Sequence, residues 1–217
     1  MEIKYIGHSS FLLKSKDTTL ITDPFDPLMV GLKFPKIDAD IITVSHSHPD
    51  HNATALVGGT PLVIDLPGEF EKKNIRIFGF SSYHDKQKGS EKGENILYKI
   101  EVEGLSILHC GDLGYVPNDD YLEQVGEIDI LMLPVGGKVT IDASEAVDLI
   151  KKIEPSIVIP MHYNSPQLKQ ENFSDLSPVA DFLKKIGAEN IVPIPKLVIK
   201  KESLVEEMKV VLLEYSK

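Results

Sequence analysis

The stretch that decides the fold of this chain is Ile41-Ile42-Thr43-Val44-Ser45-His46-Ser47-His48-Pro49-Asp50-His51. Its first four residues form a β-branched run of the kind found in buried strands. Four side chains that can bind a metal ion follow within six residues. A polar loop that is histidine-rich by chance is a poor explanation for this density, so the stretch predicts a strand that ends in a metal site.

The spacing within this motif predicts two half-sites. In an extended chain the side chains alternate, so His46 and His48 point the same way. Pro49 turns the chain, which lets Asp50 and His51 approach from another direction. Imidazole and carboxylate bind Zn²⁺ at roughly 2.0–2.2 Å and also suit Mn²⁺ or Fe²⁺. Two such cations ~3.5–4 Å apart can share a hydroxide nucleophile and stabilise a developing oxyanion.

The composition limits the class of protein. The chain has 217 residues, of which 42% are hydrophobic and 26% charged, so we expect a single globular domain over residues 1–217. Its one cysteine, Cys110, excludes an intrachain disulfide and a thiolate cluster. There is no N-terminal address and no apolar run near the ~18 residues of a membrane span, so we expect a soluble, cytoplasmic protein.

The formal net charge of −10 also limits the partners. Broad capture of nucleic acid requires a face rich in lysine and arginine, and this charge argues against one. A small anionic substrate is still possible, because bound divalent cations reverse the local field. The oligomeric state is left open.

Hydrophobic patterning predicts strands in the first half and alternating strands and helices in the second. Apolar and polar residues alternate over 96–102, and a turn at Glu103-Gly104 leads into 105–108 as a hairpin. This order predicts an α+β fold in which two sheets pack together with helices outside.

Two helices carry clear boundary signals. Asp142 and Glu145 lie in capping-box register at the start of the first. For the second we expect Ser177 as the cap, Pro178 in the first position and Gly187 at the end.

The chain resembles the metallo-β-lactamase superfamily, whose signature His-x-His-x-Asp-His is matched in full by His46, His48, Asp50 and His51. It looks most like the branch that contains the ascorbate-6-phosphate lactonases and the N-acyl-phosphatidylethanolamine phospholipases D. The resemblance runs from about Gly7 to Tyr163. Further matching segments are Gly7-His8-Ser9-Ser10-Phe11, Thr22-Asp23-Pro24, Tyr83-His84, Gly111-Asp112, Pro134-Val135-Gly136-Gly137 and Pro160-Met161-His162-Tyr163.

The resemblance implies a four-layer αββα sandwich with the site at one end of the sheets. It also implies that Asp50 orients the hydroxide and later takes up a proton. The implied ligands are His46, His48 and His84 for one metal ion, Asp50, His51 and His162 for the second, and Asp112 as the bridge.

Two residues near these ligands have open roles. His109 lies three residues before Asp112 and could replace His84 as a ligand, although a histidine bonded to the backbone near the site is the favoured reading. Asp23 could accept the free N–H of a liganding imidazole, or it could be a turn residue before Pro24.

His8, Lys138 and Leu113 complete the candidates. His8 could face the substrate or be a satisfied histidine at a strand end. Lys138 follows two glycines where the branch often has uncharged residues. It could contact a phosphate or carboxylate, although a solvated loop lysine is the commoner case. Leu113 stands where the family commonly has threonine, which removes a hydroxyl near the site.

The sequence therefore predicts hydrolysis of an ester-like bond by a metal-bound hydroxide. A phosphodiester or a phosphorylated small molecule is the favoured substrate. A lactone or carboxylic ester is the near alternative, and a metal-binding module without catalysis is the alternative from another class.

Overall fold

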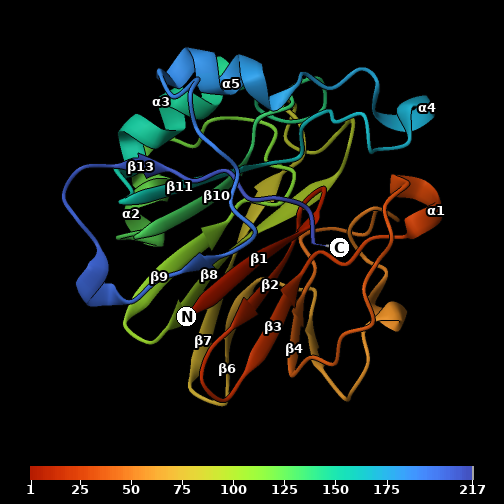
Figure 1. Ribbon diagram of the computed structural model, residues 1–217, viewed down its shortest axis with the longest axis vertical. Helices are drawn as coiled ribbons and strands as arrows, with labels where there is room; N and C mark the ends of the chain where they lie inside the picture. Colours follow the sequence, from red (N-terminus) through yellow and green to blue (C-terminus); the bar gives the residue numbers. More distant parts are fainter. Residues whose placement is uncertain (217) are drawn as a thin grey trace.

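The computed structural model describes residues 1–216, and two facing β-sheets form its centre (Figure 1). The first sheet has the order β12 (Leu197–Val198), β1 (Glu2–Gly7), β2 (Ser10–Lys14), β3 (Thr19–Thr22), β4 (Ile41–Thr43) and β5 (Leu62–Ile64). The second has the order β13 (Lys209–Val210), β11 (Ile157–Met161), β10 (Ile130–Pro134), β9 (Leu105–His109), β8 (Glu94–Val102), β7 (Ile75–Tyr83) and β6 (Gly68–Lys72). The expected hairpin is the antiparallel pair β8–β9.

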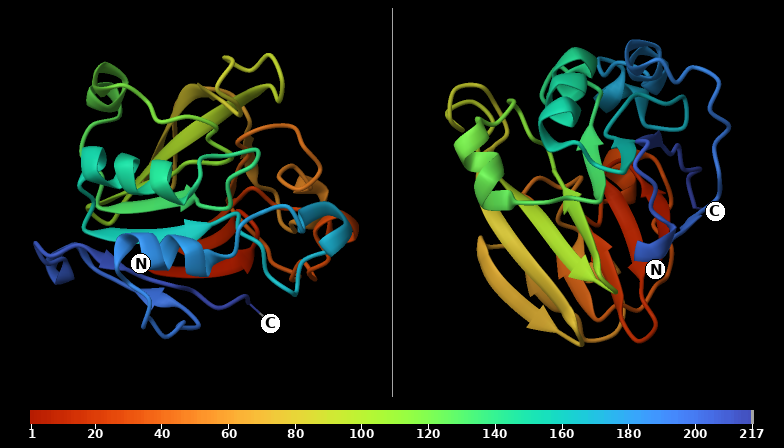
Figure 2. Two further views of the ribbon diagram at one scale, coloured as in Figure 1. Left: turned by 90° about the horizontal axis from the view of Figure 1, so that it is seen from above. Right: turned by 90° about the vertical axis from the view of Figure 1, so that its left-hand side faces the viewer.

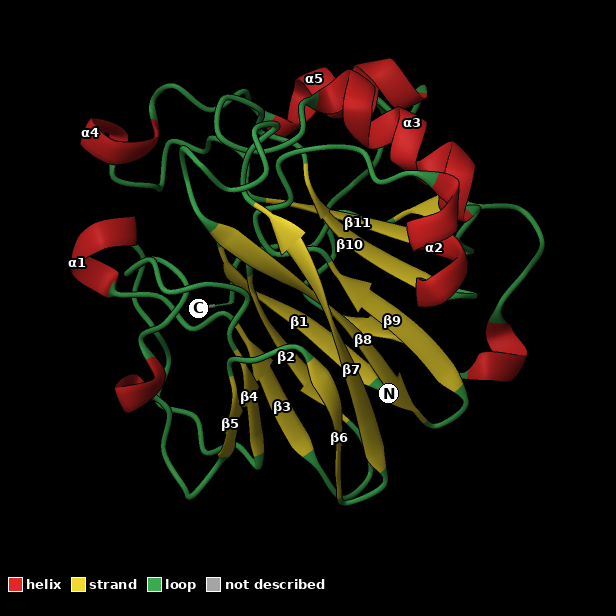
Figure 3. Cartoon of the chain, turned by 180° about the vertical axis from the view of Figure 1, so that it is seen from behind, coloured by secondary structure: helices red, strands yellow, loops and turns green. Residues whose placement is uncertain are grey.

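The helices are divided unequally between the two sheets (Figures 2 and 3). Three of them, α2 (Asp119–Val125), α3 (Ala143–Ile153) and α5 (Val179–Ile186), lie along the second sheet. Two short helices, α1 (Pro27–Val30) and α4 (Gln170–Phe173), lie beside each other on the side of the first sheet. Single 3₁₀ turns span Thr54–Leu56 and Lys201–Ser203. Within residues 1–216, no helix combines the length and apolarity needed to cross a bilayer.

The central strands β3 and β4 of the first sheet are buried on both faces because they are apolar on both sides. Leu20 and Ile41 pack in the large cluster shared with the second sheet. Their neighbours Ile21 and Ile42 point the opposite way, into a second cluster that contains residues of α1 and α4. The layers are thus helices, sheet, sheet and a thinner outer layer of loops with α1 and α4. This arrangement confirms the expected αββα sandwich.

One of the two predicted helix starts is correct and the other is displaced. Asp142 caps α3, and Glu145 completes the capping box. The expectation that Ser177 caps α5 is wrong. Pro178 occupies the N-cap position with extended backbone, and no side chain caps this helix. Ser177 instead donates its N–H to the carbonyl of Gly136, so its backbone bonds to a neighbouring loop rather than opening the helix. The helix ends at Gly187 as expected, in the left-handed conformation.

Candidate metal centre

The candidate site lies at one edge of both sheets, in the loops that follow the carboxyl ends of strands. This is where open α/β sheets usually place their ligand sites, because loops there are free to differ while the strands stay rigid. His8 follows β1, Asp23 follows β3, residues 46–51 follow β4, His84 follows β7, Asp112 follows β9, Lys138 follows β10 and His162 follows β11.

Tertiary folding brings seven of these side chains into two neighbouring groups. Within each group, the atoms that could bind a metal ion lie within 4.8 Å of one another. The groups are His46, His48 and His84, and His8, Asp50, His51 and His162. They correspond to the two ligand sets that the resemblance implies, with His8 added to the second.

Asp112 lies between the two groups. Its Oδ2 is 3.1 Å from Nε2 of His84 and 3.1 Å from Nε2 of His162. Its Oδ1 is 3.3 Å from Nε2 of His51. One carboxylate therefore faces imidazoles of both groups, which is the position that a bridging ligand requires.

Several buried atoms in this cluster have no hydrogen-bond partner. They are Nε2 of His46, Nε2 of His51 and Oδ1 of Asp112, together with Nδ1 of His8 and Nδ1 of His162. A buried polar atom that is left unpaired costs about 1–3 kcal/mol, so native structures rarely tolerate several together. Two imidazole nitrogens and a carboxylate oxygen are good donors for Zn²⁺ and suit Mn²⁺ or Fe²⁺. The residues present therefore fit divalent cations.

The charges of the cluster also suit cation binding. Burial lowers the pKa of His46 to about 3, which keeps its ring neutral. Burial opposes charge on His51 too, but the carboxylates of Asp112 and Asp50 raise the pKa of His51 well above its usual value. For Asp112, burial favours the neutral acid, but the charges of His162 and His51 hold its pKa well below the usual range. A cation that bound here would therefore meet ionised carboxylates.

Asp23 and Ser45 fix the orientation of two motif histidines. His51 donates from Nδ1 to Oδ2 of Asp23 at 2.8 Å. The Ser45 hydroxyl donates to the same oxygen at 2.6 Å, and its Oγ lies 2.9 Å from Nδ1 of His46, from which it can accept. Each histidine thus keeps its Nε2 free for the cluster. His84 is held in the same way, because its Nδ1 donates to the carbonyl of Val139 at 2.9 Å.

His109 is separated from the cluster by its own bonds. Its Nε2 lies 2.8 Å from the carbonyl of Ser9, and its Nδ1 accepts the N–H of Gly111 at 3.3 Å. Both ring nitrogens are occupied, and His109 belongs to neither group of candidate ligands. The structure therefore favours His84 over His109 at the first group.

His8 is buried and bonds to Asp50. Its Nε2 lies 3.0 Å from Oδ2 of Asp50, and burial lowers its pKa to about 4. The neutral ring therefore donates one hydrogen bond to the carboxylate, and this bond orients Asp50.

Asn95 is a site residue that sequence reasoning missed. Its Oδ1 accepts the N–H of Asp112 at 2.9 Å, and its amide donates to the carbonyl of Cys110 at 3.0 Å. Gly111 makes room for this contact. It has φ +52°, and a Cβ there would lie 2.4 Å from Oδ1 of Asn95. No pattern in the sequence marks Asn95, because it lies inside a regular strand.

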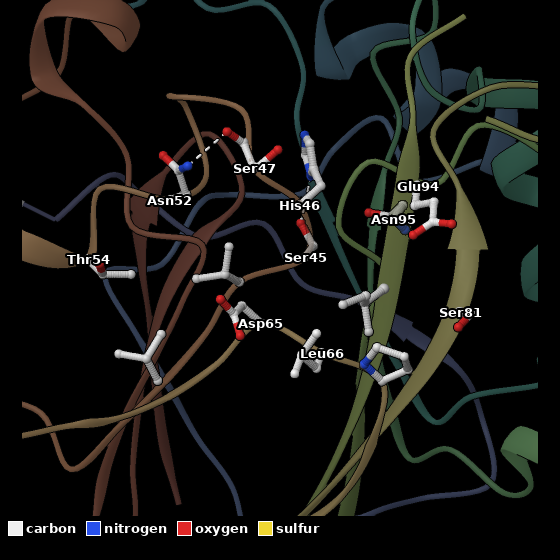
Figure 4. A pocket seen from close by; sticks show the side chains of 14 residues that line it. Ser45, His46, Ser47, Asn52, Thr54, Asp65, Leu66, Ser81, Glu94 and Asn95 are labelled. Atoms are coloured by element: carbon white, nitrogen blue, oxygen red, sulfur yellow. Dashed lines mark hydrogen bonds between the residues drawn. The ribbon is translucent and has the colours of Figure 1, made fainter. Parts of the chain in front are cut away.

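Several cavities border the cluster, and two of them differ in which candidate ligands they contact. One, of about 350 Å³, is lined by His48, Asp50, His84, Asp112 and His162. The other, of about 550 Å³, lies between residues of the first sheet and strands β7 and β8 (Figure 4). Of the candidate ligands it contacts only His46. The smaller cavity is therefore the one in which a substrate would meet the cluster.

The comparisons with known proteins agree with this geometry. Residues 2–162 match the family model of the β-lactamase superfamily domain. A UPF0173 metal-dependent hydrolase of Thermoplasma volcanium is 34% identical over 198 residues, which cover 76% of this chain and 85% of the relative.

Solved structures extend the comparison. A proposed Zn-dependent hydrolase of the metallo-β-lactamase superfamily from Thermotoga maritima is 36% identical, with a TM-score of 0.80, over 98% of this chain and 97% of that one. A metallo hydrolase from Ignicoccus hospitalis shares the fold at 21% identity, with a TM-score of 0.68, over 92% of this chain and 99% of that one. The motif, its arrangement at the sheet edge and these matches lead to one conclusion: the chain belongs to the metallo-β-lactamase superfamily.

Proposed function

We propose that this protein is a hydrolase that holds two divalent cations and cleaves an ester-like bond in a small molecule. One observation carries the proposal: two groups of candidate ligands, with Asp112 between them, open together onto one cavity. The names of the relatives support it, because they describe metal-dependent hydrolases.

The proposed first site consists of His46, His48 and His84, and the proposed second site of Asp50, His51 and His162, with Asp112 shared. Zn²⁺ suits this set best, and Mn²⁺ or Fe²⁺ are the alternatives. Cations held by these residues would supply a water of lowered pKa, near about 7, and a Lewis acid for the carbonyl or phosphoryl oxygen of the substrate.

Asp50 is the residue that we propose as the proton acceptor. Its side chain lines the substrate cavity, and its pKa is lowered, because the charge of His51 and the hydrogen bond from His8 outweigh the effect of burial. The bond from His8 orients the carboxylate, and in this position we propose that Asp50 orients the attacking water and takes up its proton.

The substrate that we propose is a phosphodiester or another phosphorylated small molecule. Lys138 supports this choice because its side chain lines the cavity. Lys138 lies on the loop after β10, where its backbone has φ +60°. A lactone or carboxylic ester places its carbonyl oxygen on the same site and is the near alternative.

The test uses purified protein loaded with Zn²⁺ or with Mn²⁺. Bis-p-nitrophenyl phosphate, a panel of lactones and nitrocefin are offered separately, and metal content is measured on the same samples. Metal-dependent turnover of one substrate, abolished by Asp112→Ala and by His48→Ala, is the expected result. Two bound metals without any turnover would favour the non-catalytic module, and unchanged activity in both variants would reject the assigned site.

A further inference from the structure

The substrate cavity has two chemically different walls. One wall carries the apolar side chains of Met29, Phe173 and Leu176, and the other carries Lys92 and Lys138. Neither wall belongs to the ligand cluster itself. The two walls therefore contact the substituents of the substrate on either side of the bond that is cleaved.

The apolar wall is built by α1, α4 and the loop after α4. The two helices are tied together, because Lys169 donates its N–H to the carbonyl of Val30 and the Asn172 amide donates to the carbonyl of Met29 at 2.8 Å. The ring of Phe173 packs on the ring of His8, with 4.8 Å between their centroids. This wall is thus anchored directly against the cluster.

Lys92 and Lys138 are the only lysine or arginine residues among the described residues that line this cavity, and they form its cationic wall. Lys92 stands at the end of the loop after β7, and Asp85 organises that loop. The Asp85 carboxylate accepts four backbone N–H groups within residues 87–92. The charge of this wall is therefore held by a loop with a defined conformation.

Lys138 already has an ion-pair partner in the cavity. It forms an ion pair with Asp175, and both side chains line the cavity and are about half exposed to solvent. Exposed ion pairs of this kind contribute little to stability. An anion that enters the cavity can therefore take the place of Asp175 at Lys138 with little loss of free energy.

We propose that the site selects amphipathic anions: an anionic group contacts Lys138 and Lys92, and an apolar group lies against Met29, Phe173 and Leu176. This inference rests on the proposed function and adds the class of substrate. The two lysines and the three apolar side chains line the same cavity as the candidate ligands His48, Asp50, His84, Asp112 and His162, so a molecule bound there meets both kinds of side chain.

The test measures binding, so that it does not require turnover. Protein loaded with Zn²⁺ is titrated by calorimetry with methylphosphonate and with hexylphosphonate, which carry the same anion. Each methylene removed from water strengthens binding about fourfold. Hexylphosphonate should therefore bind at least about tenfold more tightly than methylphosphonate, if two or more methylenes are buried.

Four variants separate the two walls. Met29→Gln should reduce the difference between the two ligands and leave methylphosphonate binding unchanged. Lys138→Gln should weaken both ligands, by about threefold each. Asp175→Asn should strengthen both by a similar factor, because it releases Lys138; a merely structural role cannot produce this gain. Lys86→Gln is the matched control, since Lys86 pairs with Glu145 and does not line this cavity.

Several results would overturn the inference: equal affinities for the two phosphonates, equal effects of Lys138→Gln and Lys86→Gln, or weaker binding in Asp175→Asn. Failure of the proposed function looks different. It appears as an absence of turnover in metal-loaded protein, whether or not the phosphonates bind as expected.

Discussion

His51 and Asp23 are joined by a hydrogen bond of 2.8 Å between Nδ1 and Oδ2, and both side chains are fully buried. The two residues come from different loops, after β4 and after β3. This bond sets the tautomer of His51, so that Nε2 is the nitrogen that faces Asp112.

Asp23→Asn should therefore weaken metal binding, because the amide is a poorer acceptor and carries no charge to support the imidazole. Loss of such a partner typically costs 10–100-fold in metal affinity. Competition with a fluorescent chelator measures the change. Asp17→Asn, at an exposed position in a turn, is the control. Equal affinities in the two variants would contradict the role given to Asp23.

His84→Ala should change the metal content of the protein, whereas His109→Gln should change its stability. His84→Ala should lose about one equivalent of metal, because it removes a member of the first group. His109→Gln should keep its metal but lower the free energy of unfolding by about 1–3 kcal/mol, because it disturbs two buried hydrogen bonds. Elemental analysis and urea denaturation of both variants test this. A loss of metal in His109→Gln alone would reverse the assignment.

Removal of metal should lower the thermal stability of the protein. Ions that bind only the folded state stabilise it by about 4 kcal/mol at a thousandfold excess over Kd. For a chain of this size the midpoint should then fall by roughly 10 °C after chelation. Differential scanning calorimetry before chelation, after chelation and after return of Zn²⁺ checks this. A midpoint that does not respond to any of these steps would argue against a preformed cation site.

Asp85 should make stability depend on pH in the acid range. Burial opposes its ionisation, but the backbone N–H groups of Lys92, Glu91, Gly89 and Gln87 lower its pKa in the folded state. A lowered folded pKa means that the stabilisation is complete above the unfolded value of about 3.9 and is lost as the pH falls below it.

Asp85→Asn should therefore be less stable than the wild type at neutral pH and approach it in acid. Urea midpoints measured for both proteins from about pH 6 to about pH 3 would show the two curves converge. Parallel curves would show that the carboxylate charge has no part in holding the loop. Asp148→Asn, at an exposed position on α3, serves as the control.

Local chemistry made much of this protein predictable. The alternation over residues 96–102 predicted a half-buried strand, and the capping box at Asp142 predicted the start of α3, because both signals depend on neighbours in the chain. Ser177 was misassigned since serine is a good cap in general, whereas here its backbone bonds to the loop after β10.

The run from Ile41 to His51 determined by itself that a buried strand ends in candidate metal ligands, because residue type and spacing are properties of the chain alone. Only the tertiary structure decided that both nitrogens of His109 are occupied, that Asn95 supports Asp112, and that Lys92 and Phe173 line the same cavity. Those relations join residues far apart in sequence, and the packing of the two sheets sets their distances.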